Sequence, residues 1–137
     1  MNLCEGYLDV SVPSIDGSHS LESLNLPYTG ANALLYDPPK ELMKYIAYCE
    51  GYKTPAYFGV KDAGDIQNLN PLLKFPLFVK PAKAGDSLGV DEKSWVHDHP
   101  ELEQKVTGLL KEYDEVLVEE YIDGREFTVL VAAKPGN

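Results

Sequence analysis

The sequence has little of what marks a secreted or membrane-spanning protein. Its 137 residues include only two cysteines, Cys4 and Cys49, which are too few for a disulfide framework. No apolar run approaches the ~20 residues that a membrane-spanning helix needs. The N-terminus shows no basic segment followed by an apolar stretch, the pattern of a secretory signal. We therefore expect a cytoplasmic protein with reduced thiols and no membrane span.

Basic residues are also scarce. The chain has 12 lysines and arginines against 22 acidic residues, which gives a net charge of −10. Nonspecific binding to nucleic acid or to an anionic membrane needs a basic surface, so the composition argues against both partners. A few well-placed lysines and backbone N–H groups can still hold a small anion such as a phosphate.

The remaining composition is that of a folded protein, with 44% hydrophobic and 10% aromatic residues. A chain of this length is enough for one domain with a real core, or for pieces of two. Residues 1–31 have the pattern of the end of a βα-type unit, in which residues 2–6 would end a buried strand. Residues 32–137 form the main unit.

A helix is predicted over residues 40–50, because prolines precede it and a glycine follows it. The apolar spacing predicts one buried stripe on this helix. That stripe consists of Met43, Ile46 and Ala47. Lys40 and Lys44 are then expected nearer to solvent.

A second helix is predicted after Asp98, which has the spacing of a capping box with Glu101. Apolar residues then recur on one helical face. They are Leu102, Val106, Leu109 and Leu110. His97 and His99 beside the cap could suggest a metal site, but exposed histidines around a helix start are the more frequent arrangement.

The other apolar runs predict an antiparallel sheet. Short strands are expected at residues 56–60 and 77–79, and a hairpin is expected from strands at 116–121 and 127–133, joined through an Asp-Gly turn. Strands with one covering helix in this order indicate an α+β fold.

Lys80 ends one predicted strand, and the glycine-containing loop AGDSLG follows at residues 84–89. A lysine fixed at a strand end can direct its ammonium toward a phosphate or an adenine ring nitrogen. Small loop residues let backbone N–H groups approach a ligand closely. Taken alone, a lysine that extends into solvent and an ordinary turn explain the same residues.

Three glutamates gather around the predicted hairpin: Glu119, Glu120 and Glu126. Successive strand residues point to opposite faces, so Glu119 and Glu120 cannot both face one site. A carboxylate here could accept from an adenine amino group, and Glu126 suits the hydroxyls of a ribose. A solvated acidic hairpin is the plain alternative.

Taken together and in this order, these segments resemble the ATP-grasp fold in its D-alanine–D-alanine ligase-like branch. The resemblance runs through LPYTG at 26–30, Lys40 with Lys44, FPLFVKP at 75–81, GDSLG at 85–89 and VLVEEYIDGREFT at 116–128. It implies an α+β fold, the ATP-grasp small nucleotide-binding subdomain, preceded by the end of a βα-type N-terminal domain.

The resemblance implies that one group of residues binds the phosphates. Lys40 would touch them, and Lys80 would bridge adenine and the α-phosphate. Ser87, with the loop amides, would cover the β- and γ-phosphates.

A second group of residues would bind the nucleoside. Glu119 and the backbone of Glu120 and Ile122 would read adenine. Glu126 would hold the ribose.

The family's reaction is the activation of a carboxylate by ATP to an acyl phosphate, which an amine attacks to form an amide, with Mg²⁺ bridging the phosphates. The family's metal ligands and catalytic arginine follow the hinge, so we expect this chain to be a fragment that carries the ATP-binding portion and no catalytic or metal-binding residue. ATP, a small carboxylate and an amine are the expected partners, and a homodimer is a further expectation. A noncatalytic nucleotide-binding module or pseudoenzyme fragment stays open as the alternative.

Overall fold

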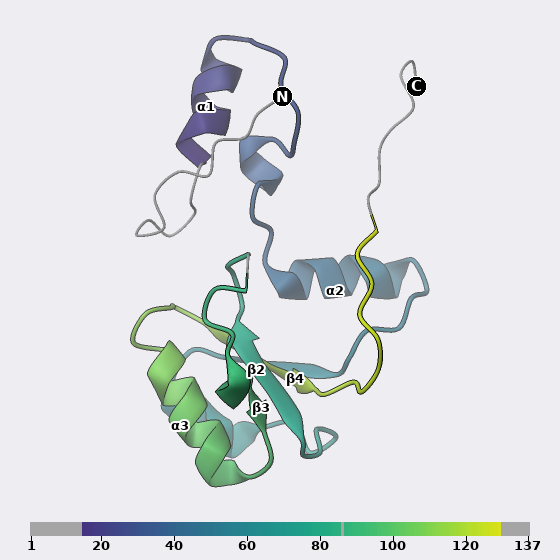
Figure 1. Cartoon of the computed structure of the whole chain (residues 1–137), viewed down its shortest axis with the longest axis vertical. Coiled ribbons are helices and arrows are strands. Elements are labelled where there is room, and N and C mark those ends of the chain that lie inside the picture. The colour runs from purple at the N-terminus through teal and green to yellow at the C-terminus, as the bar shows by residue number, and fades with distance from the viewer. Residues whose placement is uncertain (1–14, 86, 130–137) are drawn as a thin grey trace.

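The computed structural model describes residues 15–85 and 87–129 (Figure 1). The α-helices of this part are α1 (Ile15–Ser23), α2 (Lys40–Cys49) and α3 (His99–Leu109). The strands are β1 (Tyr57–Val60), β2 (Leu77–Pro81), β3 (Trp95–Val96) and β4 (Val116–Glu120). Short 3-10 helices are η1 (Ala33–Leu35), η2 (Ala63–Asn68) and η3 (Glu92–Ser94). The predicted α+β class is confirmed.

The strands form one antiparallel sheet with the order β1-β4-β2-β3. β4, the last strand in sequence, lies between β1 and β2. Val118 therefore faces Phe58 on one side and Val79 on the other. Residues 116–119 of β4 consequently have a neighbour on both sides, which places Glu119 in the middle of the sheet.

Helix α3 covers one face of this sheet, and the two together form the core (Figure 1). The Asp98 side chain caps the helix by accepting from the Glu101 N–H at 2.9 Å, as predicted. The Glu101 carboxylate reaches back to the N–H of His97 at 2.8 Å, one residue before the cap. The buried core consists of Val60, Ile66, Leu73, Leu77, Val79, Val96, Leu102, Val106, Leu109, Val116 and Val118.

Helix α2 lies over the opposite face, and the prediction of its buried stripe is wrong. Met43 and Ile46 are 48% and 53% exposed. The side chain of Lys44, predicted nearer to solvent, is only 10% exposed. The helix turns a polar stripe toward the sheet because Lys44 meets a buried carboxylate there, and apolar periodicity carries no information about such an ion pair.

Two backbone features fix the start of α2 and its closeness to the sheet. The N–H of Lys40 donates to the carbonyl oxygen of Ala82, just after β2, at 3.1 Å. On β1, a Cβ at Gly59 would lie 2.7 Å from Glu41 Oε1. The Glu41 side chain therefore lies against β1.

The predicted hairpin has only its first strand in the described residues. β4 ends at Glu120, and residues 121–129 form no strand, so the second strand is wrong for residues 127–129. Phe127 and Val129 are 75% and 77% exposed, and this segment has no neighbouring strand with which to form a ladder. The rest of that prediction, residues 130–133, and the predicted strand end at residues 2–6 lie outside the described residues.

The first described elements, α1 and η1, lie apart from the sheet in Figure 1. Glu22 joins them, because its Oε1 accepts from the Tyr28 hydroxyl at 2.6 Å and from the Ala33 N–H at 2.9 Å. These bonds lower the pKa of the Glu22 carboxyl. Within the described ranges, no helix is long and apolar enough to cross a membrane. The predicted domain boundary after residue 31 stays a prediction.

Candidate functional site

One row of side chains crosses the sheet on the face that α2 covers. The register places Tyr57 opposite Glu119, Glu119 opposite Phe78, and Phe78 opposite Trp95. Opposed residues of antiparallel strands share a face, so these four side chains lie side by side. Trp95 also stacks on Tyr121, with 5.0 Å between ring centroids. The row is an aromatic surface interrupted by one acid.

Glu119 is the buried charge of this row, with 6% of the residue exposed. Its Oε1 accepts a hydrogen bond from Lys80, and Lys44 Nζ lies 2.7 Å from its Oε2. Among the described residues, Oε2 accepts no hydrogen bond of good angle, so Lys44 holds it by charge alone. This oxygen is buried, and its hydrogen-bonding capacity is unused among the described residues. Glu120, its neighbour in sequence, is exposed, which confirms the prediction that the two face opposite ways.

Lys44 is a site residue that the sequence reasoning missed. Its ammonium also donates to the Pro55 carbonyl at 3.2 Å and lies 5.3 Å from the centroid of the Tyr57 ring. The signal was in the sequence, because Lys40 and Lys44 are four residues apart and share one helical face. We name Lys40, Lys44, Lys80 and Glu119 the lysine cluster.

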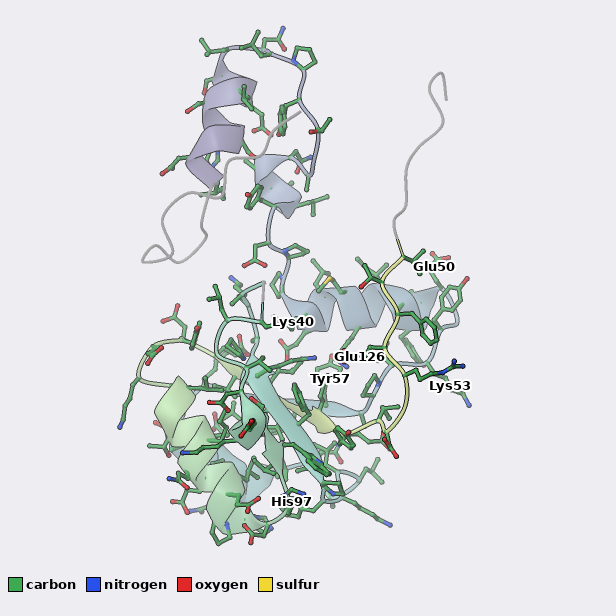
Figure 2. The ribbon with its side chains drawn as sticks, viewed as in Figure 1. Lys40, Glu50, Lys53, Tyr57, His97 and Glu126 are labelled. Atoms are coloured by element: carbon green, nitrogen blue, oxygen red, sulfur yellow. The ribbon has the colours of Figure 1, made fainter. Side chains whose placement is uncertain are left out.

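Lys40 connects α2 with the loop that follows β2. Its Nζ donates to the Ala84 carbonyl at 2.7 Å. Burial, and then the nearby charge of Lys80, lower the pKa of Lys40, while Asp37 and Glu119 oppose that effect. Figure 2 shows Lys40 at the start of α2, above the sheet that carries Tyr57. An added anion would relieve this repulsion between the two ammonium groups.

The loop after β2 carries Ser87 at an exposed position. Ala84 and Ser87 both have positive φ, +115° and +59°, although neither is glycine. Two turns shape the loop, closed by bonds of 3.0 Å from the Leu88 N–H to the Gly85 carbonyl and from the Val90 N–H to the Ser87 carbonyl. The structure thus places the Ser87 hydroxyl on an open loop near Lys40, without a described contact to the lysine cluster.

The predicted nucleoside residues after β4 are exposed. The Glu120 N–H donates to the Ala56 carbonyl at 2.9 Å, so a base contact from Glu120 would use its carbonyl oxygen. Ile122 is 59% exposed. Glu126 is exposed as well, and no described hydrogen bond or ion pair engages its carboxylate (Figure 2). The structure does not bring Glu126 into contact with the lysine cluster.

The chemistry of the cluster is that of an anion site next to a hydrogen-bond acceptor. Two ammonium groups pair with one carboxylate, and Lys40 lies beside the glycine-containing loop. With the charge of Asp37 near Lys40 included, three cations stand against two carboxylates, an excess of one positive charge. The adjacent aromatic row suits a flat ring. In residues 15–85 and 87–129, no group of three or more histidine, cysteine, aspartate or glutamate side chains could hold a metal ion.

A groove of about 790 Å³ lies between α3 and the segment from Gly89 to His97. Asp91 and Lys105 pair within it at 2.8 Å, and this bond lowers the pKa of Asp91. The groove contains none of the residues predicted to bind a nucleotide. The groove is lined by more acidic side chains than basic ones, Asp91, Glu92, Glu101 and Glu112 against Lys93 and Lys105. The lysine cluster has an excess of positive charge, so the cluster is the stronger candidate for a nucleotide.

Comparison with known families identifies the chain. Residues 54–136 match the family model described as D-ala D-ala ligase C-terminus, which covers more than half of the sequence. The chain belongs to this ligase family. The predicted resemblance is thereby confirmed.

Curated relatives agree with the family assignment. The chain is 37% identical over 113 residues to a D-alanine–D-alanine ligase of Aquifex aeolicus, a match that covers 80% of this chain and 37% of that protein. It is 33% identical over 113 residues to a D-alanine–D-alanine ligase of a Marinomonas species, covering 81% of this chain and 35% of that protein. The chain therefore spans about a third of the length of these relatives.

Solved structures share the fold. The Bacillus anthracis D-alanine–D-alanine ligase complexed with ATP superposes with a TM-score of 0.65 at 34% identity, covering 79% of this chain and 36% of that one. The Helicobacter pylori D-alanine–D-alanine ligase gives a TM-score of 0.66 at 30% identity, covering 78% and 32%. The sheet with its helices is thus the ATP-grasp architecture of these ligases.

Proposed function

We propose that this chain is the ATP-binding portion of an ATP-grasp ligase that joins a carboxylate to an amine through an acyl phosphate. The observation that carries the proposal is the lysine cluster set against the aromatic row, in a chain of this family. A relative of this fold has been solved in complex with ATP, which supports the same ligand here.

The charges of the cluster support a nucleotide better than a simple anion. Lys40 and Lys80 lie on the loop side, where a triphosphate would gain two charge-assisted contacts. Glu119 supplies an acceptor for a base amino group, beside rings on which the base can lie. Binding of an inorganic anion would explain the two lysines, but it would not explain the acceptor beside the aromatic rings.

Each residue takes its part in this proposal. Lys40, Lys80 and Ser87 would bind the phosphates. Glu119, with the backbone of Glu120 and Ile122, would bind adenine, and Glu126 would bind the ribose. Glu126 is exposed, and no described hydrogen bond or ion pair engages its carboxylate, which leaves it available for the ribose hydroxyls.

Magnesium belongs to the proposal as the cation that accompanies the triphosphate and neutralises its charge. The described residues offer no group of ligands that fits it. We therefore assign magnesium no protein ligand in this chain and no step of the reaction.

The wider protein is also a matter of proposal. Its substrates would be a small carboxylate and an amine, its location the cytoplasm, and its assembly a homodimer. Residues 1–31 would end the preceding domain, and residues 32–137 would form part of the ATP-grasp domain. The exposed apolar residues of α2, such as Leu42, Tyr45 and Ile46, support self-association.

Titration calorimetry of the 137-residue chain with ATP tests the function. We expect saturable binding that Lys80→Ala weakens by roughly ten- to a hundredfold, the value of one hydrogen bond to an ionised group. Lys111→Ala is the matched control, because Lys111 is exposed after α3, on the face away from the cluster. If no nucleoside triphosphate binds, or if both variants weaken binding equally, the proposal is wrong.

A further inference from the structure

Lys44 is held differently from the other two lysines of the cluster. Its ammonium has three fixed neighbours: Glu119 Oε2 at 2.7 Å, the Pro55 carbonyl at 3.2 Å and the Tyr57 ring at 5.3 Å. Only 10% of its side chain is exposed, against 22% for Lys80. Lys44 is therefore packed between α2 and the sheet, on the side of Glu119 away from the glycine-containing loop.

These contacts make Lys44 unsuited to bind phosphate. If its ammonium turned toward a ligand, Glu119 would remain buried with one cation fewer, and uncompensated buried charge is strongly unfavourable. Lys80 is less constrained, because its side chain is 22% exposed and lacks the second oxygen partner that the Pro55 carbonyl gives Lys44. The two lysines thus have different roles: Lys80 faces the ligand, and Lys44 holds the Glu119 carboxylate.

The orientation of the Glu119 carboxylate determines with which base it can form a hydrogen bond. An ionised carboxylate only accepts hydrogen bonds, so it favours the amino group of adenine and repels the carbonyl oxygen at the same position of guanine. A carboxylate that is turned away from the base no longer accepts from the adenine amino group, so this preference is lost. Base preference consequently depends on a cation that holds the Glu119 carboxylate in one orientation, and Lys44 lies 2.7 Å from its Oε2.

We propose that Lys44 is a positioning residue that sets the preference of this site for adenine over guanine by fixing the Glu119 carboxylate. The inference rests on the proposed function, since it specifies how the same site selects its nucleotide. Lys44 itself touches no nucleotide.

The test is the ratio of ATP to GTP affinity, measured by calorimetry on the full 137-residue chain and its variants. Lys44→Met removes the charge and keeps an unbranched apolar stem. We expect it to lower the ratio on the order of tenfold, the value of one hydrogen bond to a charged group. Lys44→Arg, which keeps the charge, should hold the ratio within about threefold of the unmodified chain.

A double-mutant cycle separates positioning from general damage to the fold. In the Glu119→Gln background, Lys44→Met should change the ratio no further, because its target is already gone. A general structural role would instead lower the affinities for ATP and GTP equally in both backgrounds. Because each ratio comes from a single protein preparation, partial loss of folded protein does not alter it.

The outcomes distinguish this inference from the function on which it rests. If Lys44→Met leaves the ratio unchanged, or if the effects of Lys44→Met and Glu119→Gln on the ratio are additive, the inference fails while nucleotide binding stands. If Lys44→Met does not fold, Lys44→Arg decides alone, and a folded Arg variant with a tenfold lower ratio overturns the inference. If the unmodified chain binds neither nucleotide, the proposed function fails first.

Discussion

The indole of Trp95 stacks on the ring of Tyr121, with centroids 5.0 Å apart and planes inclined by 29°. Tyr121 directly follows β4, at the start of the segment that carries the proposed nucleoside residues. Trp95 is also the single tryptophan of the chain and shares the row of Phe78 and Glu119. One chromophore therefore lies beside the proposed base site.

We predict that ATP changes the fluorescence of Trp95, because a base on the aromatic row alters both the stacking and the exposure of the indole, now 44% exposed. Titration with ATP and excitation of tryptophan would show a saturable change. Inorganic triphosphate is the control, since it carries the phosphates without the base and should change the signal little. Equal responses to both ligands would argue against a base on this surface.

Removing the Glu126 carboxylate should weaken the binding of nucleotides, because a ribose contact is lost, and should leave base preference intact. We expect Glu126→Ala to reduce affinity for ATP and GTP by a similar factor, on the order of tenfold for one charge-assisted bond. The effect should disappear with 2′,3′-dideoxy-ATP, which lacks both hydroxyls. Glu120→Ala is the matched control, since Glu120 is an exposed neighbour whose proposed contact is through its backbone. A full effect of Glu126→Ala on the dideoxy nucleotide would contradict the ribose assignment.

The lowered pKa of Lys40 predicts a dependence of ATP affinity on pH. Burial and Lys80 favour the neutral amine of Lys40, whereas a bound phosphate favours its ammonium. Affinity should be full below the lowered pKa and should fall as the pH rises through it, before ordinary lysines with a pKa of about 10.4 lose their protons. Calorimetry between about pH 7 and about pH 10 would measure this, with Lys40→Arg expected to keep its affinity over the range because arginine stays charged. Parallel curves for the two proteins would contradict the prediction.

The core between α3 and the sheet should dominate stability. Leu102 is fully buried, so Leu102→Ala should cost about 2–5 kcal/mol in the free energy of unfolding. Leu72→Ala makes the same change at a residue that is 78% exposed and should cost far less. Denaturant unfolding followed by circular dichroism would compare the two. Similar unfolding midpoints for the two variants would mean that the core between α3 and the sheet does not dominate stability.

The sequence predicted the elements around the hydrophobic core well, and it predicted α2 and the segment after β4 less well. The face of α3 and the strands β1, β2 and β4 followed from apolar patterns and a cap, because burial of apolar surface decides both. The orientation of α2 did not, because Lys44 faces inward to meet Glu119 from a strand 75 residues later, a partner invisible to local periodicity. Likewise, the pattern of residues 127–133 is that of a strand, but a strand forms only beside a neighbour, and residues 127–129 have none.

Part of the candidate site could be predicted, because strand geometry limits which side chains can face it. Strand alternation allowed only one of Glu119 and Glu120 to face α2, and the structure selects Glu119. The pairing of Lys44 with the Glu119 carboxylate could not be predicted, since it depends on the side-chain distances between helix and sheet.

The polar inner stripe of α2 has a mechanical consequence. An apolar interface interlocks by shape, so sliding it opens voids and costs packing energy. The contact of α2 with the sheet depends instead on long lysine side chains that can change rotamer and keep their partners. A phosphate that binds Lys40 would therefore draw on the rotamers of that side chain, while the backbone bond to Ala82 and the contacts of Lys44 hold the helix, and the core beneath α3 stays as it is.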